Sequence, residues 1–341
     1  MIAVTGANGY VGKCICQAAE QSGVQIKKIT REIAGDLAVD TLDPAHLAGC
    51  TAVIHTAARA HRMGEFGESA LAAYRATNVV GTAKLIAAMR SAKVSRLIYV
   101  SSIKALGERS MQRPLGPDEQ RMPEDPYGIS KAEAEETVLA AHAAGFIEAV
   151  IIRPVLVYGE GAKGNLERLL SAIAHGRLLP VGGIRNRRSM IGVGNLAEAV
   201  LASATASAVR SGHHGQHGMS EITKQNSIQV DQQKPPTSVP RSPIYHVADD
   251  GVVSTRRLVE VLADGMGVKP RLINLPRWLA VGGATLLGKG AMARRLFDDL
   301  EVDASAFTKD TGWQPKKLLE DGLREMAAAY AQQHRVGRFA S

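Results

Sequence analysis

Three glycines near the start of the chain limit its fold more than any other feature. Residues 1–4 are apolar and predict a strand, and Gly6, Gly9 and Gly12 follow before a helix-forming stretch that reaches about residue 21. Glycines placed in this way permit a tight turn, close packing of helix on strand, and approach of a diphosphate to N–H groups at the helix N-terminus. The spacing is GxxGxxG rather than GxGxxG, so the strand before it and the helix after it make the motif informative.

Strand-like and helix-like segments alternate through the first half of the chain. The apolar run at 51–55 is typical of a strand that is buried on both faces of a parallel sheet. The alternation predicts an α/β fold of the Rossmann type, a doubly wound parallel sheet that forms an NAD(P)-binding domain over residues 1–160. Further strands are expected at 24–30, 96–100 and 147–152, and helices from the region before Asn78 to about residue 90 and over 126–145.

The second half predicts a smaller α/β substrate lobe, formed by residues 161–194 and 267–335. Segments 195–206 and 244–266 are expected to return to the first domain. Residues 207–243 are poor in hydrophobic residues and rich in Ser, Gln, His and Pro, which predicts a disordered insertion. Helices are expected near 195–206, 255–266, 276–287 and 318–333, and a strand at 244–247.

The composition is that of a soluble cytoplasmic protein with no membrane partner. The 341 residues are 45% hydrophobic, and no stretch approaches the roughly 18 uncharged apolar residues of a membrane span. Cys14, Cys16 and Cys50 lack CxxC spacing, which favours reduced thiols and no metal site. The formal charge of +8 is scattered along the chain, and only 4% of residues are aromatic; both facts argue against binding of nucleic acid. The positive charge either attracts anionic small molecules or belongs to an ordinary solvated surface.

Tyr127 and Lys131 carry the strongest indication of chemistry. Side chains four residues apart share a helix face, with Cβ atoms roughly 5–6 Å apart. An ammonium at that distance favours the phenolate, so it would lower the tyrosine pKa from about 10 and provide an acid/base group near neutral pH. The same spacing also occurs between surface residues of ordinary amphipathic helices, so other motifs in the chain are needed to distinguish a catalytic pair from two surface residues.

The end of the second expected strand should meet the adenosine ribose of a dinucleotide. A carboxylate there would bind the 2′-hydroxyl of NAD, and a cation would accommodate the 2′-phosphate of NADP. Arg31 occupies this point, with Glu32 beside it, and favours NADP over NAD as the cofactor. Asp36 can accept from the adenine amino group, and Asp40 is a competing choice for that role.

Several further residues are predicted to lie at the cofactor or the substrate. Ala57 and Ala58 are small, so a cofactor can lie across the strand end that precedes them. Arg185, Arg187 and Arg188 either grip a diphosphate or form a solvated loop. The remaining predicted cofactor residues are Leu37, Asn78, Lys131 and Pro154, and the remaining predicted substrate residues are Lys104 and Asn165.

Seven ordered motifs resemble the extended short-chain dehydrogenase/reductase family, the NAD-dependent epimerases and dehydratases. Within it, the chain looks most like the nucleotide-sugar epimerases and 4-keto reductases related to UDP-glucose 4-epimerase, and the likeness covers nearly everything outside 207–243. The motifs are TGANGYVG at 5–12, HTAA at 55–58, NVVGT from Asn78, YVSS at 99–102, YGISK at 127–131, RP at 153–154 and VYG at 157–159.

This resemblance implies a role for each site residue. Tyr127 would exchange a proton with O4 of a UDP-sugar, and Ser102 would hydrogen-bond the same oxygen. Lys131 would hold the nicotinamide ribose and lower the Tyr127 pKa. Asn78 would support the site, and Arg188 would bind the UDP diphosphate. Gly6, Gly9, Tyr10, Val11 and Gly12 would cradle the cofactor diphosphate, and a homodimer would form through helices near 67–91 and 126–145.

Differences between this chain and the family pattern limit the reactions that it can be expected to catalyse. The 4,6-dehydratases carry an Asp-Glu pair after the triad hydroxyl, where this chain has Ile103-Lys104, so dehydration is not expected. Lys104 and the Arg59-to-Arg62 stretch also differ from the usual epimerase pattern. A 4-epimerase would keep NAD bound and return the hydride, whereas a 4-keto reductase would consume NADPH. Arg31 favours the reductase slightly.

Two other readings keep the fold but change the function. One is a redox-sensing regulator that binds NAD(P) without catalysis, and the presence of Tyr127, Lys131 and Ser102 argues against it. The other is a reductase of a steroid-like or flavonoid ketone, against which the arginines at 185–188 argue because they suit an anionic diphosphate.

Overall fold

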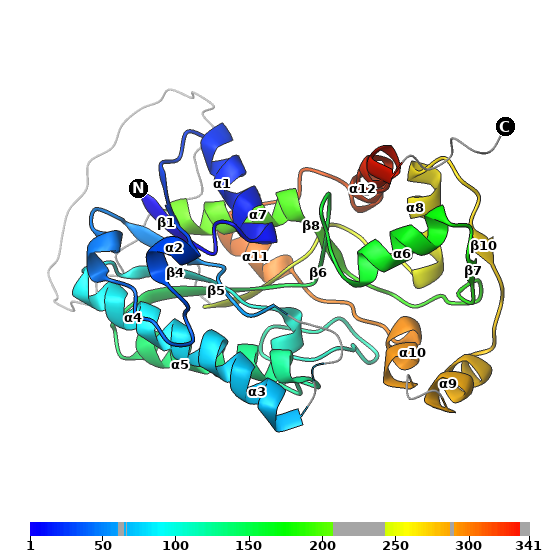
Figure 1. Cartoon of the computed structure of the whole chain (residues 1–341), viewed down its shortest axis with the longest axis horizontal. Coiled ribbons are helices and arrows are strands. Elements are labelled where there is room, and N and C mark those ends of the chain that lie inside the picture. Colours follow the sequence, from blue (N-terminus) through cyan, green and yellow to red (C-terminus); the bar gives the residue numbers. More distant parts are fainter. Residues whose placement is uncertain (61–64, 66, 207–242, 287–289, 335–341) are drawn as a thin grey trace, which may run out of the picture.

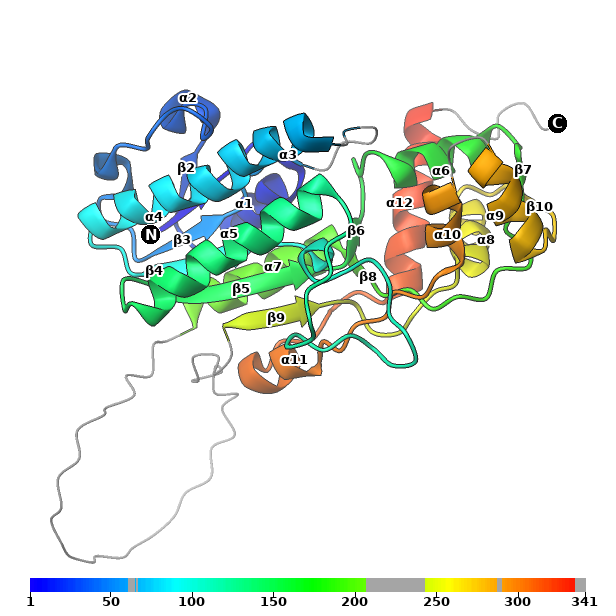
Figure 2. The same cartoon turned by 90° about the horizontal axis from the view of Figure 1, so that it is seen from below.

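The computed structural model describes residues 1–60, 65, 67–206, 243–286 and 290–334, which form a sheet domain and a smaller lobe beside it (Figures 1 and 2). The sheet domain contains six strands in the order β2-β1-β3-β4-β5-β9, and each neighbouring pair is parallel. The strands are β1 (Ile2–Thr5), β2 (Ile26–Ile29), β3 (Ala52–His55), β4 (Arg96–Val100), β5 (Glu148–Pro154) and β9 (Ile244–Val247). The predicted Rossmann-type fold is confirmed.

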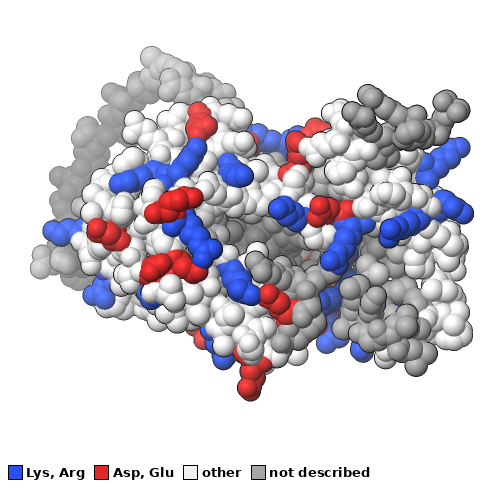
Figure 3. Space-filling view, in the orientation of Figure 1, with Lys and Arg blue, Asp and Glu red and all other residues white. Residues whose placement is uncertain are grey.

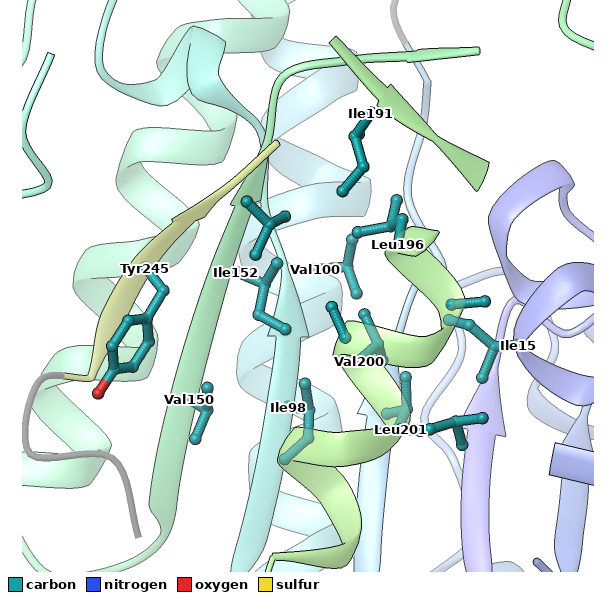
Figure 4. Packing of buried hydrophobic residues seen from close by; sticks show 14 of the residues in the cluster. Ile15, Ile98, Val100, Val150, Ile152, Ile191, Leu196, Val200, Leu201 and Tyr245 are labelled. Carbon is teal, nitrogen blue, oxygen red and sulfur yellow. The ribbon is translucent and has the colours of Figure 1, made fainter. Parts of the chain in front are cut away.

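Helices cover both faces of this sheet because its strands are apolar on both sides. One face carries α1 (Tyr10–Gln21) and α7 (Val193–Thr205), which pack against each other and on the sheet. Figure 4 shows Leu196 and Val200 of α7 over Ile98 of β4 and Ile152 of β5, with Ile15 of α1 beside them. The other face carries α3 (Gly67–Arg75), α4 (Gly81–Ser91) and α5 (Pro126–Ala143).

The helix expected to run to about residue 90 is interrupted. A π-helical turn at Ala76–Val80 separates α3 from α4 and contains the buried Asn78. Wider turns of this kind are rare and often lie at functional sites. The sequence pattern gives no indication of it, because its residues are compatible with a continuous α-helix.

The smaller lobe has its own apolar core. It is formed by α6 (Asn165–Ala174), α8 (Thr255–Gly265) and α12 (Leu319–His334), whose buried residues include Leu170, Leu262 and Leu323. The lobe also contains α9 (Arg277–Leu286) and α10 (Gly290–Phe297), which pack against each other (Figure 2). Short strand pairs add to it: β6 (Leu156–Tyr158) with β8 (Met190–Gly192), and β7 (Leu178–Leu179) with β10 (Arg271–Leu272).

Three elements after residue 190 belong to the sheet domain: α7, β9 and α11 (Ser305–Thr311). Helix α7 packs on α1, and β9 pairs with β5, but α8 packs against α6 and α12 in the smaller lobe rather than on the sheet. Helix α11, from the stretch expected in the substrate lobe, instead packs on β9. The insertion expected at 207–243 lies outside the described residues except for Pro243.

A buried hydrogen-bond network joins the two parts of the chain. The Tyr158 hydroxyl donates to Asp249 Oδ2 at 2.6 Å, and Asn195 Nδ2 donates to Asp249 Oδ1 at 2.7 Å. Gly192 N also donates to Asp249 Oδ2, at 3.0 Å. Because both carboxylate oxygens are satisfied, Asp249 can remain buried where β8, α7 and the strand end of β9 meet.

Among the described residues, no helix is long and apolar enough to cross a bilayer.

Candidate active site

The glycine turn between β1 and α1 is shaped to accept a diphosphate. Gly6 has φ +71°, and a Cβ there would lie 2.6 Å from Ala57 N, while a Cβ on Gly12 would lie 2.2 Å from Gly6 O. Only glycine fits such contacts. Gly9 is the N-cap of α1 and provides no side-chain hydrogen bond to the helix. No capping side chain occupies the first N–H groups of α1, so they can bind an anion, and the turn has the shape that the diphosphate of a dinucleotide requires.

Arg31 and Asp36, both predicted to bind the adenosine end, contact each other. Arg31 is the first residue of α2 (Arg31–Ala34), directly after β2, and its exposed guanidinium forms an ion pair with Asp36 Oδ2. Asp36 Oδ1 also accepts from Ala38 N at 3.0 Å. Asp40, the competing choice, accepts from Asp36 N at 2.6 Å and so supports this turn.

The other predicted cofactor residues lie at the carboxyl ends of the strands. Ala57 and Ala58 follow β3, and the Ala57 backbone is against Gly6. Leu37 lies against Gly81, at the first residue of α4. Tyr10 and Val11 are the first two residues of α1, and Pro154 is the last residue of β5.

Asn78 ties the segment after β3 to the helix that carries Tyr127. Its Oδ1 accepts from Arg59 N at 2.8 Å, and its Nδ2 donates to Ser130 Oγ at 3.0 Å and to Arg59 O at 3.3 Å. The side chain is almost completely buried. Asn78 therefore supports the site through the backbone and through α5.

Tyr127 lies in the first turn of α5, whose start is fixed by its neighbours. Pro126 occupies the first helical position, and the N-cap Asp125 accepts from Gly128 N at 2.7 Å. The half-buried Tyr127 ring lies edge-on to Tyr74, with ring centroids 6.0 Å apart. Ser102, which follows β4, lies close enough to Tyr127 for its hydroxyl to lower the pKa of the phenol. The structure thus brings together two members of the predicted triad.

Lys131, one turn further along α5, is buried behind this pair. Its Nζ donates to Val100 O at 2.8 Å and lies 4.3 Å from the centroid of the Tyr99 ring. The carbonyl and the aromatic face both stabilise an ammonium, but burial is the stronger effect and lowers the pKa of Lys131 to about 7.

The spacing between Tyr127 and Lys131 predicts a lowered pKa for the tyrosine, but the pKa of Tyr127 is raised in the folded protein. Burial raises the pKa of Tyr127 to about 12; the Ser102 hydrogen bond lowers it, and Asp125 and Tyr74 raise it further. The expected lowering by a lysine ammonium is absent, because burial also disfavours the charge on Lys131. The phenol is therefore protonated at neutral pH and is poised to donate.

A buried carboxylate that the sequence analysis missed lies one helical turn beyond Lys131. Glu135 is fully buried and accepts from Arg153 Nε at 2.9 Å, from Arg153 Nη2 at 2.7 Å and from Ser101 Oγ at 2.5 Å. Arg121 Nη2 lies 3.1 Å from the same carboxylate. Glu135 also raises the pKa of Lys131. Its spacing of four residues from Lys131, on the same helix face, could have indicated it.

Lys104, predicted to contact substrate, lies in an ion cluster beside Ser102. Its Nζ is 2.5 Å from Asp125 Oδ2 and 3.1 Å from Glu108 Oε1. Glu108 is buried, which raises its pKa, and it accepts from Arg295 Nη2 of α10 at 2.9 Å. The cluster links the loop after β4 to the smaller lobe.

The three arginines at 185–188 do not come together as one anion-binding site. Arg187 pairs with Glu301, at 2.6 Å between Nε and Oε2, and Arg185 is exposed. Arg188 turns inward, where its Nη1 donates to Arg295 O at 2.9 Å and to Asp298 O at 3.2 Å. Asn165, the other predicted substrate residue, is exposed at the first position of α6. The space-filling view shows the molecule hollowed between the two parts, with Lys and Arg on both sides (Figure 3).

His55 is a structural residue at the end of β3. Its Nδ1 lies 2.6 Å from Thr5 Oγ1 and its Nε2 lies 3.2 Å from Thr82 Oγ1. Burial and the nearby Lys131 lower the pKa of His55 to about 3, and burial also lowers the pKa of His246 to about 4. Both imidazoles are therefore neutral in the folded protein at neutral pH.

These two histidines predict a loss of stability on acidification. Their folded-state pKa values lie below the unfolded value of about 6.5, so the unfolded chain binds more protons and stability falls as the pH drops below that value. From pH 6.5 to about 5 the two groups together should remove about 3 kcal/mol of unfolding free energy. Urea unfolding across this range measures the slope.

A His246→Gln variant isolates this effect. It should remove about half of the slope, since one of the two neutral buried imidazoles is gone. Glu108 and Asp249, whose pKa values are raised by burial, act in the opposite direction and are unchanged in the variant. An unaltered slope would show that His246 does not control the response.

Comparison with known proteins agrees with the fold and identifies the family. The NAD dependent epimerase/dehydratase family matches residues 2–216. A UDP-glucose 4-epimerase of Vibrio cholerae is 30% identical, over 97% of this chain and 95% of that protein. An N-acetyl-alpha-D-glucosaminyl-diphospho-ditrans,octacis-undecaprenol 4-epimerase of Escherichia coli O157:H7 is 34% identical over 58% of this chain and 61% of its own.

Solved structures share the fold at low sequence identity. MoeE5 in complex with UDP-glucose and NAD has a TM-score of 0.70 at 21% identity, covering 98% of this chain and 99% of that one. RMD from Pseudomonas aeruginosa complexed with NADPH has a TM-score of 0.68 at 20% identity, covering 97% and 99%. The fold and the site define an NAD(P)-dependent enzyme of the short-chain dehydrogenase/reductase type. The chain belongs to the NAD dependent epimerase/dehydratase family.

Proposed function

We propose that this enzyme transfers a hydride at C4 of a UDP-linked hexose, with Tyr127 exchanging the proton at O4. The observation that carries the proposal is the placement of Tyr127, in the first turn of α5, beside Ser102 at the carboxyl end of β4, the edge of the sheet that also carries the glycine turn. NAD(P) supplies the hydride or accepts it. The protein's own groups must then bind the sugar, orient it and move one proton.

Each group has a distinct task in this proposal. The phenol of Tyr127 is protonated at neutral pH because burial raises its pKa to about 12, so it can donate directly to an oxygen that gains negative charge at C4. Ser102 hydrogen-bonds the same oxygen. Lys131 holds the nicotinamide ribose. Arg188 is the arginine proposed for the substrate diphosphate, through the N–H groups that remain when its Nη1 donates to the carbonyls of Arg295 and Asp298. Lys104 and Asn165 are the other proposed substrate contacts.

Reduction of a 4-keto sugar fits these groups slightly better than epimerisation. A phenol that is already protonated is suited to donation to a ketone oxygen, whereas oxidation of C4 first needs a base. Arg31 favours NADP by its position, although its pairing with Asp36 reduces the free charge that it offers to a phosphate. Dehydration is not favoured, because Asp125, the carboxylate nearest to Lys104, is held by Lys104 and by Gly128 N.

A second candidate changes only the carrier of the hexose. The relative from Escherichia coli acts, by its name, on a sugar joined through a diphosphate to undecaprenol. UDP-sugars and polyprenyl diphosphate sugars share the hexose and the diphosphate, so the roles of Tyr127, Ser102 and Arg188 would be the same. In either case we propose a cytoplasmic homodimer, formed through α3, α4 and α5.

The state of the purified cofactor separates reductase from epimerase. Denaturation releases it for identification by mass, and the enzyme is then tested for NADPH oxidation with a UDP-4-keto-6-deoxyhexose. Consumption of NADPH by an enzyme without retained cofactor would establish a 4-keto reductase. Tightly held NAD, with interconversion of UDP-hexose epimers and no net cofactor turnover, would establish a 4-epimerase. Activity on neither UDP-sugar would contradict the proposed substrate.

Cofactor choice is tested at Arg31. Arg31→Ala should raise the KM for NADPH about tenfold and leave the KM for NADH nearly unchanged, because a charge-assisted hydrogen bond to a phosphate contributes on the order of 1.4 kcal/mol. Asp36→Asn should shift the preference toward NADPH by releasing the guanidinium. Equal effects of Arg31→Ala on both cofactors would contradict the assignment of Arg31 to the 2′-phosphate.

A further inference from the structure

The segment that contains α9 and α10 differs in charge from the rest of the chain. No Asp or Glu occurs between Asp264 and Asp298, although the whole chain contains 33 of them. The same stretch carries Lys269, Arg271, Arg277, Lys289, Arg294 and Arg295. A segment with cations alone attracts anionic surfaces and repels another copy of itself.

The described part of this segment also exposes large apolar side chains. Trp278 is 72% exposed, Leu279 and Leu296 are each 43% exposed, and Ile273 is 40% exposed. On α9 the exposed positions Trp278, Gly282 and Thr285 follow one another at helical spacing, so they form an outer stripe without a charged residue. Trp278 and Leu279 are adjacent in the first turn of α9, so this turn presents two large apolar side chains to the surroundings, as a surface that contacts an apolar phase does.

The two helices lie along one side of the smaller lobe, with β7 and β10 at its far end (Figure 1). Each helix is attached to the rest of the protein by an ion pair. Arg277 of α9 pairs with Asp298, at 2.7 Å between Nη2 and Oδ1, and Arg295 of α10 pairs with Glu108. Arg271 and Arg294 are exposed. The surface therefore combines exposed cations with exposed apolar side chains on a supported pair of helices.

We propose that α9 and α10 bind the surface of a bilayer that contains anionic phospholipids. Trp, Leu and Ile would enter the interface while Arg271 and Arg294 contact the lipid phosphates, as in helices that lie in the membrane plane. This binding would be peripheral, in keeping with the absence of a spanning helix among the described residues, and it departs from the sequence-based expectation of no membrane partner. It does not depend on the proposed reaction.

Membrane binding at this place has a consequence for the active site. Arg295 of α10 pairs with Glu108, which in turn pairs with Lys104, two residues after Ser102. The lipid-binding surface is thus joined by two ion pairs to the loop that carries the proposed catalytic serine.

The test uses the full chain and Trp278 as its own reporter. The chain has two Trp, and Trp313→Phe leaves Trp278 alone. Vesicles of phosphatidylcholine with about one third phosphatidylglycerol should shift the Trp278 emission to the blue and sediment with the protein, and vesicles of phosphatidylcholine alone should do so at least about fivefold more weakly. The double variant Trp278→Ser, Leu279→Ser should lower vesicle binding about tenfold or more, with unchanged thermal unfolding.

Matched variants control for exposure and charge. Leu318→Ser removes an apolar side chain that is 63% exposed elsewhere and should leave vesicle binding unchanged. Arg294→Glu should weaken binding about fivefold or more, and Lys309→Glu on α11 should not. The proposal is overturned if wild-type protein ignores anionic vesicles at low salt, or if the Trp278 and Leu279 changes alter the oligomeric state in solution but not vesicle binding.

Discussion

Tyr127→Phe should lower turnover by about 10²–10⁴-fold while the protein still binds NAD(P). Proton transfer by a positioned side chain contributes about this factor, and Phe retains the ring that packs edge-on to Tyr74 but cannot donate a proton. The glycine turn that fits the cofactor diphosphate is on another segment and is unchanged. Steady-state kinetics measure the first effect, and cofactor titration by calorimetry measures the second.

Tyr74→Phe is the matched control for this experiment. It removes a hydroxyl that donates to Ala60 O at 3.3 Å and keeps the ring beside Tyr127, so turnover should change only a few-fold. Full activity of Tyr127→Phe would remove Tyr127 from the chemistry. Cofactor binding by a wild-type protein without any turnover would instead favour the redox-sensing regulator.

The sequence predicts those parts of the protein that rest on local patterns. The strand, the three glycines and the helix at the start of the chain are adjacent in sequence, so their order alone specifies the turn. The buried strands and Pro126 before Tyr127 are local features of the same kind. Ser102 and Tyr127 meet as expected because the carboxyl ends of parallel strands share one edge.

The remaining features depend on contacts between distant residues. Glu108 is paired with Arg295, and α8 packs on α12, and no periodicity in either segment indicates its partner. The pKa of Tyr127 differs from the sequence-based expectation for the same reason. Spacing predicts that Lys131 is near, but the extent to which burial raises one pKa and lowers the other is a property of the folded protein.

Glu135→Gln should destabilise the protein by about 3–5 kcal/mol. Glu135 and Arg153 are 0% and 1% exposed, and removal of one charge leaves the other buried without compensation. The variant also loses the strong acceptor of the Ser101 hydroxyl. Urea unfolding at neutral pH measures the change in free energy.

Two comparisons separate the buried pair from ordinary surface electrostatics. Glu198→Gln breaks an ion pair with Lys316, at 3.0 Å between Nζ and Oε1, whose lysine side chain is 77% exposed, and it should cost less than about 1 kcal/mol. The double variant Glu135→Leu, Arg153→Met should be more stable than Glu135→Gln, because Arg153 is no longer left with an unpaired buried charge. Equal costs for Glu135→Gln and Glu198→Gln would be incompatible with this account. Glu135 also raises the pKa of Lys131, so the loss of the Glu135 charge should leave a larger fraction of the Lys131 amine neutral at pH 7. The same carboxylate therefore affects both the stability of the protein and the charge next to Tyr127.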